Sequence, residues 1–140
     1  MVYILEPEVA GGWGEETEAD TSCHPPKVSK LTYQFEGWLG DELLESFPCF
    51  IISQNLAKLI TNASLTGYTL NPVKITRSDN FLELYPDIEL PPFHWLQVNG
   101  VIGVNDFAIN NKHLLQVSEA AFKVLSQVTI DHCGVVKVSL

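Results

Sequence analysis

The chain has 140 residues, of which 46% are hydrophobic and 18% charged, and its formal net charge is −9. This length is typical of one domain, and the apolar content excludes a disordered chain because enough surface can be buried to offset the entropy of ordering. The negative charge disfavours nucleic acids and anionic membranes and favours a basic partner. We therefore predict a single domain over residues 1–140 that binds neither nucleic acid nor membrane.

The acidic residues are concentrated in the first third of the chain. Residues 1–46 contain ten acids and two lysines, a net charge of −8, whereas residues 47–140 are nearly neutral. Within this third, residues 7–26 contain several glycines and prolines and follow neither a helical nor a strand period. We predict a long acidic loop there, because long loops in compact domains are commonly functional or disordered.

The N-terminal sequence predicts no export signal. Its apolar run over residues 2–5 stops at Glu6 and has no positive region before it, and no stretch approaches the ~20 apolar residues of a membrane span. Cys23, Cys49 and Cys133 are an odd number without close pairing, which is typical of reduced thiols. We expect a cytoplasmic protein.

The first 48 residues predict two strands and one short helix. Residues 2–5 form an apolar run, and residues 31–35 alternate between apolar and polar side chains, as strands do. Asp41 is expected to cap a short helix over residues 42–45 that ends before Pro48.

A second strand–helix pair is predicted immediately afterwards. Residues 49–52 are a continuous apolar run, which indicates a strand covered on both faces. Ser53 is the expected N-cap of the following helix. Leu56, Leu59 and Ile60 have the spacing of one buried helical stripe.

The middle of the chain predicts three further elements. Residues 68–70 and 73–75 read as a strand pair or as one interrupted strand. Ser78 is expected to cap a short helix that ends before Pro86. Residues 94–98 then predict another strand.

The final third repeats an earlier pattern. Residues 115–125 align with residues 50–60 at a constant offset of 65, so that Ser118 meets Ser53 as a predicted N-cap. A β-branched strand is expected after each helix, the second over residues 135–138. We predict two β-α-β-like units around one sheet in an α+β domain, with a mixed, mainly antiparallel sheet and two or three short helices. Duplication and convergence both remain open as origins of the similarity.

No motif in the sequence predicts catalysis. Cys23-His24 and His132-Cys133 together supply a zinc-type set of side chains but lack the spacing of a zinc motif, so we expect no metal and no cofactor. A Cys–His nucleophile aided by Asp106 or Asp131 remains a formal pairing that only geometry can decide. We predict no catalytic residue and no enzyme.

Residues from Trp38 to Cys133 carry a family resemblance. The segments that carry it are Gly37-Trp38-Leu39-Gly40-Asp41, Phe47-Pro48-Cys49-Phe50-Ile51-Ile52-Ser53, Leu90-Pro91, Trp95-Leu96-Gln97-Val98, Asp106-Phe107 and Leu115-Gln116-Val117-Ser118-Glu119. This pattern resembles small bacterial immunity proteins of polymorphic-toxin and contact-dependent growth inhibition systems. The resemblance implies a non-enzymatic cytoplasmic inhibitor that binds one cognate toxin domain and blocks its active surface.

The acidic residues suggest where such a partner binds. Because many secreted toxins are nucleases with basic surfaces, an acidic inhibitor can associate with them quickly. The first candidate patch has Trp13 as its anchor, surrounded by Glu15, Glu16, Glu18 and Asp20. The second consists of Trp38, Asp41, Glu42 and Glu45. Two other functions remain open, a non-catalytic adaptor subunit with an acidic docking segment and a Cys/His-dependent hydrolase.

Overall fold

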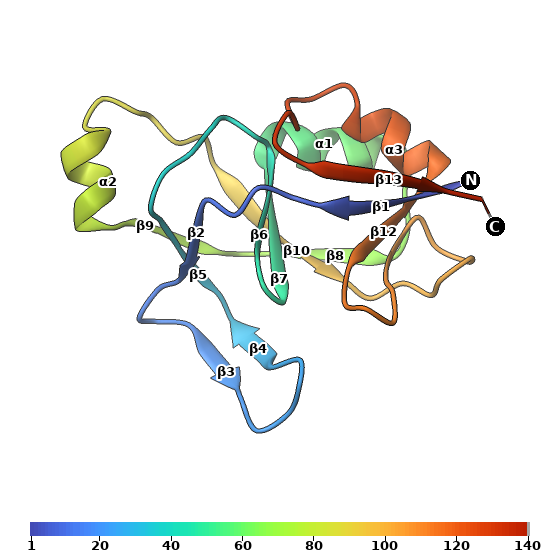
Figure 1. Cartoon of the computed structure of the whole chain (residues 1–140), viewed down its shortest axis with the longest axis horizontal. Coiled ribbons are helices and arrows are strands. Elements are labelled where there is room, and N and C mark those ends of the chain that lie inside the picture. The colour runs from blue at the N-terminus through green and yellow to red at the C-terminus, as the bar shows by residue number, and fades with distance from the viewer. Residues whose placement is uncertain (140) are drawn as a thin grey trace.

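A central antiparallel sheet, covered on both faces, lies at the middle of the fold (Figure 1). The structure is a computed structural model and describes residues 1–139. The strand β7 is buried at every residue, as predicted for a strand covered on both faces. Its alternate side chains enter different cores, since Phe50 and Ile52 belong to one hydrophobic cluster and Cys49 and Ile51 to the other. The strands, in spatial order, are β6 (Leu43–Ser46), β7 (Cys49–Ser53), β10 (Phe93–Val98) and β8 (Tyr68–Asn71).

A second four-stranded sheet and two helices complete the hydrophobic cluster that contains Phe50 and Ile52, which we call the first core. The helices pack against each other, and their buried residues, such as Leu56 and Ala121, meet Leu115 and Val117 of the second sheet. This sheet consists, in spatial order, of β11 (Phe107–Ile109), β12 (Leu115–Ser118), β1 (Val2–Glu6) and β13 (Gly134–Val138). The helices are α1 (Gln54–Asn62) and α3 (Glu119–Leu125).

A smaller sheet and a third helix form the second core on the opposite face of the central sheet. Tyr33, Phe35 and Phe81 are fully buried there against Trp95. The sheet contains β2 (Gly11–Trp13), β5 (Thr32–Phe35) and β9 (Lys74–Arg77), with β5 and β9 parallel. The helix α2 (Asp79–Leu84) lies at the end of the molecule away from both termini (Figure 1).

A hairpin arm projects from this smaller sheet. It contains β3 (Glu18–Asp20) and β4 (Lys27–Lys30), which pair only with each other among the described strands. Residues 7–26 therefore do not form the predicted long loop, because part of the segment completes β2 and part forms β3. We use the name arm for residues 14–31.

The two predicted β-α-β-like units are present, but they lie in two sheets and not in one. Each unit consists of a hairpin, a helix and a strand, namely β6-β7-α1-β8 and β11-β12-α3-β13. The strand orders of their sheets correspond position by position, with β1 taking in the second sheet the place that β10 has in the first. The prediction of one sheet was wrong because each unit recruits its own additional strand.

Serine caps begin all three described helices. The hydroxyls of Ser53, Ser78 and Ser118 each accept a hydrogen bond of 3.1 Å from the backbone N–H three residues later. These three predicted caps are confirmed, as is the α+β class with mainly antiparallel strands. Within residues 1–139, no helix has the length and apolar character needed to cross a membrane.

The predicted helix over residues 42–45 was wrong. This segment forms β6, which pairs with β7. Leu43 and Leu44 are both fully buried and belong to opposite core clusters, an arrangement that a strand provides and one face of a surface helix does not. Asp41 consequently caps no helix.

Candidate functional site

Trp13 attaches the arm to the body of the protein. It lies half-buried in β2 and packs against the core cluster that contains Tyr33 and Phe35. Its indole Nε1 is buried and has no hydrogen-bond partner. The predicted anchor is therefore directed largely toward the protein's own core.

The acids of the arm have lysines beside them. Glu16 forms an ion pair with Lys74 of β9, and this hydrogen bond lowers the pKa of the Glu16 carboxyl. On the arm itself, Glu18 is the register partner of Lys30, and Asp20 is that of Lys27. Glu15, Glu16, Glu18 and Asp20 are all exposed, but they do not form a uniformly negative surface.

The second predicted patch consists largely of structural contacts. Asp41 is fully buried, and its backbone oxygen accepts a hydrogen bond of 2.8 Å from Trp38 Nε1. The carboxylate of Glu42 accepts hydrogen bonds from Ser53, Asn55 and the backbone N–H of Thr129. Glu45 is partly buried, and this burial, together with the charge of Glu6, raises its pKa. The structure therefore does not bring Trp38, Asp41, Glu42 and Glu45 together as one exposed patch.

Exposed apolar side chains instead gather at the end of the molecule that carries α2. While Phe81 inserts into the core, Leu82, Leu84 and Tyr85 are 51%, 67% and 40% exposed. Tyr85 also lines a groove of about 430 Å³, together with the exposed Val9 and Leu39 and the half-buried Trp38. Large exposed apolar groups rimmed by polar residues are typical of protein-binding surfaces.

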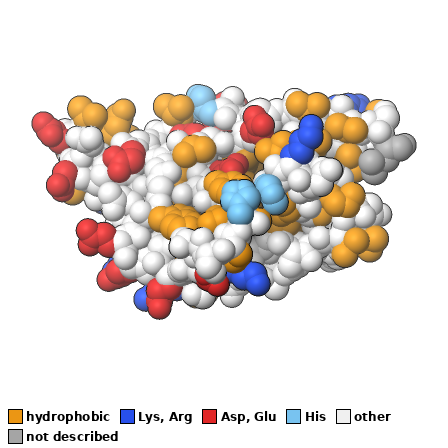
Figure 2. Space-filling view, turned by 60° about the horizontal axis from the view of Figure 1, so that its bottom comes forward, with side chains coloured by type: hydrophobic (Ala, Val, Ile, Leu, Met, Phe, Trp, Pro, Cys, Tyr) orange, Lys and Arg blue, Asp and Glu red, His pale blue; other side chains and the backbone are white. Residues whose placement is uncertain are grey.

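Acidic residues predominate beside these apolar groups, next to which Arg77 is the neighbouring base. Residues 79–89 contain four acids and no Lys, Arg or His, and Glu36 borders the groove. All five of these acids are exposed, and Figure 2 shows red and orange side chains side by side at this end. We call this surface the α2 end; it comprises Val9, Glu36, Trp38, Leu39, Asp79, Leu82, Glu83, Leu84, Tyr85, Asp87 and Glu89. The sequence signal that could have revealed it is the run of four acids without a base, interleaved with Leu82, Leu84 and Tyr85.

A group of three ionisable side chains, two of them buried, borders the same groove. Glu8 lines the groove and is only 8% exposed; its Oε2 accepts a hydrogen bond of 3.0 Å from the backbone N–H of Leu39. The carboxylate of Asp41 accepts hydrogen bonds from the backbone N–H of His132 at 2.9 Å and pairs with its Nδ1 at 3.0 Å. The bond to Asp41 raises the pKa of the His132 imidazole. Neither predicted patch included Glu8 or His132, because the contact joins distant parts of the chain.

Cys49 and Cys133 are not activated as nucleophiles. Burial raises the pKa of Cys49 to about 12 and that of Cys133 to about 11, so both retain their protons at neutral pH. Asp106, one candidate acid for a Cys–His pair, is hydrogen-bonded to Ser118 and Thr66. This geometry gives no support to the Cys/His-dependent hydrolase.

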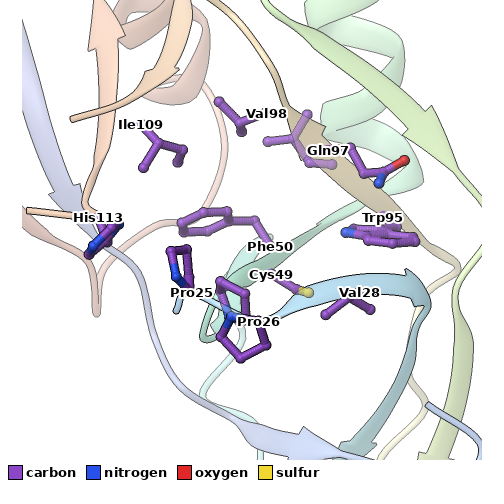
Figure 3. Close-up of a pocket in the computed structure, with 12 residues that line it drawn as sticks. Pro25, Pro26, Val28, Cys49, Phe50, Trp95, Gln97, Val98, Ile109 and His113 are labelled. Atoms are coloured by element: carbon purple, nitrogen blue, oxygen red, sulfur yellow. The ribbon is translucent and has the colours of Figure 1, made fainter. Parts of the chain in front are cut away.

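An apolar cavity of about 300 Å³ separates the arm from the central sheet (Figure 3). The ring of Phe50 lies in its middle, between Pro25 and Pro26 of the arm on one side and Val98 and Ile109 on the other. The lining is predominantly apolar, and its polar side chains are Gln97 and His113. The cavity therefore lies at the contact between the arm and the central sheet.

Comparison with known proteins leaves the function to be inferred from these surfaces. No protein-family model matches the chain. No curated protein matches its sequence.

Proposed function

We propose that this protein is a non-enzymatic cytoplasmic inhibitor that binds a cognate toxin domain through its α2 end. The observation that carries the proposal is the exposed group of Leu82, Leu84 and Tyr85 beside the acids of residues 79–89. Arg77 is the base next to this group, where it lies over the Phe81 ring, so the acids outnumber the bases at this end. The resemblance of residues 38–133 to bacterial immunity proteins supplies the class of partner.

The composition of the α2 end suits a tight protein interface. Apolar and aromatic side chains at the centre of a contact supply most of the binding free energy once water is excluded. Acids at the rim accelerate association with a basic surface and discriminate against acidic partners. A nuclease-type toxin, whose substrate-binding surface is basic, matches both properties, and covering that surface would block its activity.

Co-expression tests the function directly. A toxin domain encoded beside this protein's gene is induced in cells with and without the intact protein, and we expect survival only when the protein is present. The surface is tested in the same cells with Glu83→Lys/Asp87→Lys/Leu84→Arg, for which we expect survival to fall, and with Val104→Arg, which changes an exposed valine outside the α2 end and should preserve it.

Two results would contradict the proposal. If cells survive equally well with and without the protein, the immunity function is refuted. A stable complex with the toxin domain that does not protect the cells would favour the adaptor function instead. Full protection by the α2-end variant, at an expression level equal to that of the intact protein, would show that the partner binds elsewhere.

A further inference from the structure

We infer that Glu8, Asp41 and His132 form a binding site for a divalent transition-metal ion, with Zn²⁺ as the best match. One potential ligand atom from each residue lies within 4.8 Å of the other two. The three residues come from distant segments, since Glu8 precedes β2, Asp41 precedes β6 and His132 precedes β13. This inference is independent of the proposed toxin binding.

The burial of two carboxylates so close together calls for a cation. Asp41 is fully buried and Glu8 is 8% exposed, and burying a carboxylate is costly unless it is paired and hydrogen-bonded. Asp41 has partners, since its Oδ2 accepts from the backbone N–H of His132 and its Oδ1 lies 3.0 Å from the imidazole Nδ1. Glu8 Oε1, in contrast, is buried and has no hydrogen-bond partner. The group therefore holds a carboxylate oxygen with unused capacity to coordinate an ion.

No lysine or arginine among residues 1–139 forms an ion pair with these carboxylates. Glu6 lies two residues before Glu8, Asp131 immediately precedes His132, and the backbone N–H of Glu45 donates to the backbone oxygen of Glu8. Among residues 1–139, the lysine ion pair of the structure is Lys74–Glu16, on the smaller sheet. In the described part of the chain, the side chain that pairs with this acidic site and can carry a positive charge is the His132 imidazole.

Two carboxylates and one imidazole are a ligand set that Zn²⁺ uses readily, whereas Ca²⁺ and Mg²⁺ prefer oxygen ligands alone. With bonds of about 2.0–2.2 Å, tetrahedral zinc places its ligand atoms about 3.4 Å apart. The pair of Asp41 Oδ1 and His132 Nδ1, at 3.0 Å, is already close to that separation, and zinc binding would release the proton shared between them to solvent. The His132 side chain is 44% exposed, so an ion can enter from the solvent side.

The proposed ligands differ from the zinc-type set suggested by the sequence. Of the two Cys–His pairs, His132 alone takes part, while the thiol of Cys133 donates to the backbone oxygen of Gly134. His24 lies near Phe47 and His113, with ring centroids 6.0 and 5.5 Å away. The carboxylates of Glu8 and Asp41 take the places of the thiolates.

Calorimetric titration of the full chain tests the site. After treatment with a chelator and its removal, ZnCl₂ should bind at one equivalent with a dissociation constant in the micromolar range or tighter, and thermal unfolding should shift upward by several degrees. Glu8→Gln and His132→Asn should each weaken binding by at least tenfold, and CaCl₂ should produce no such shift. Circular dichroism confirms that each variant is folded.

Matched controls separate this site from other zinc ligands. Cys23→Ser, Cys133→Ser and His113→Asn should bind zinc as the intact chain does. The inference is overturned if folded wild-type protein binds no zinc at millimolar concentration. It is equally overturned if His132→Asn binds as tightly as wild type, or if a cysteine variant abolishes binding, since the ligands would then be others.

Discussion

Glu42 and Asp106 occupy equivalent positions in the two β-α-β-like units and make equivalent connections. Glu42 Oε1 accepts a hydrogen bond of 2.8 Å from the hydroxyl of Ser53, the N-cap of the helix in its own unit. Its Oε2 accepts one of 3.0 Å from the backbone N–H of Thr129, which follows the helix of the other unit. One carboxylate thus joins both halves of the first core.

Asp106 makes the reciprocal connection. It accepts a hydrogen bond of 2.7 Å from the hydroxyl of Ser118 in its own unit and one of 2.8 Å from the backbone N–H of Thr66, which follows α1. The correspondence therefore extends beyond the segments that align in sequence, to the residues that link the two units. Each unit therefore donates a backbone hydrogen bond to a carboxylate of the other unit.

We predict that Glu42→Ala and Asp106→Ala lower the free energy of unfolding by similar amounts, about 1–3 kcal/mol each, because each change removes hydrogen bonds to a charged group and leaves a helix cap with one partner fewer. Urea denaturation at neutral pH measures both. Glu83→Ala, a change at an exposed acid, serves as the control and should stay within about 0.5 kcal/mol of wild type. If the Glu42 and Asp106 variants unfold at the same urea concentration as the Glu83→Ala control, these hydrogen bonds do not contribute to the free energy of unfolding.

The same carboxylate predicts a specific loss of stability in acid. Burial raises the pKa of Glu42, but the hydrogen bonds from Thr129, Ser53 and Asn55 outweigh burial and hold it below its usual value of 4.5. Because the folded pKa is lowered, this stabilisation is present above about pH 4.5 and disappears as the pH falls through the folded pKa.

The stability difference between wild type and Glu42→Gln should accordingly be largest near neutral pH and shrink in acid. Urea denaturation at a series of pH values measures it, with both proteins in the same buffers. A difference that stays constant from neutral pH down to about pH 3 contradicts the assignment, since ionised Glu42 would then make no special contribution to the native state.

Tyr33 provides a test of the second core. Its hydroxyl oxygen accepts a hydrogen bond of 3.0 Å from the backbone N–H of Ala10, and its O–H donates one of 3.1 Å to the backbone oxygen of Glu45. Burial raises the Tyr33 pKa to about 12, so the hydroxyl remains protonated. Tyr33→Phe leaves the Ala10 N–H without this partner and should cost about 1–3 kcal/mol of unfolding free energy.

The matched control for Tyr33→Phe is Tyr85→Phe, which removes an exposed hydroxyl and should change stability by less than about 0.5 kcal/mol. Chemical denaturation of the two variants under identical conditions gives the comparison. Equal stabilities would mean that water replaces the Tyr33 hydroxyl at no cost.

Much of this fold could be predicted because the deciding interactions are local. A serine cap bonds to an N–H three residues away, so the starts of the helices after Ser53, Ser78 and Ser118 are visible in the sequence. The helix expected over residues 42–45 was also predicted from local signals, namely Asp41 as its N-cap and Pro48 after its end. It failed because both Leu43 and Leu44 are buried by partners that are remote in the sequence.

The binding surface was harder to predict because charge compensation depends on partners in space. The net charge of the first third did not reveal that Lys74, from another segment, pairs with Glu16. It also did not reveal that Asp41 is buried against His132, which is 91 residues away. Counting charge along the chain therefore drew attention to the arm and away from α2, whose four acids take part in no ion pair among the described residues.

The three thiols are predicted to differ in reactivity. Because burial keeps Cys49 and Cys133 protonated, with pKa values of about 12 and 11, iodoacetamide at pH 7.5 should modify Cys23 first. Cys49 should react only when urea unfolds the chain. Peptide mass spectrometry over a time course identifies the modified sites, and rapid modification of native Cys49 or Cys133 would revive the thiol-dependent hydrolase as a candidate.

The most direct test of the account is the affinity of purified toxin domain for variants of the two acidic surfaces, measured at low and high salt. We expect Glu83→Lys/Asp87→Lys to weaken binding by at least tenfold at low salt and to reduce its salt dependence, because rim charges steer association. Glu15→Lys/Glu18→Lys, the matched charge reversal on the arm, should have a much smaller effect. Unchanged affinity of the α2-end variant, with a large loss for the arm variant, would contradict the placement of the binding surface at α2.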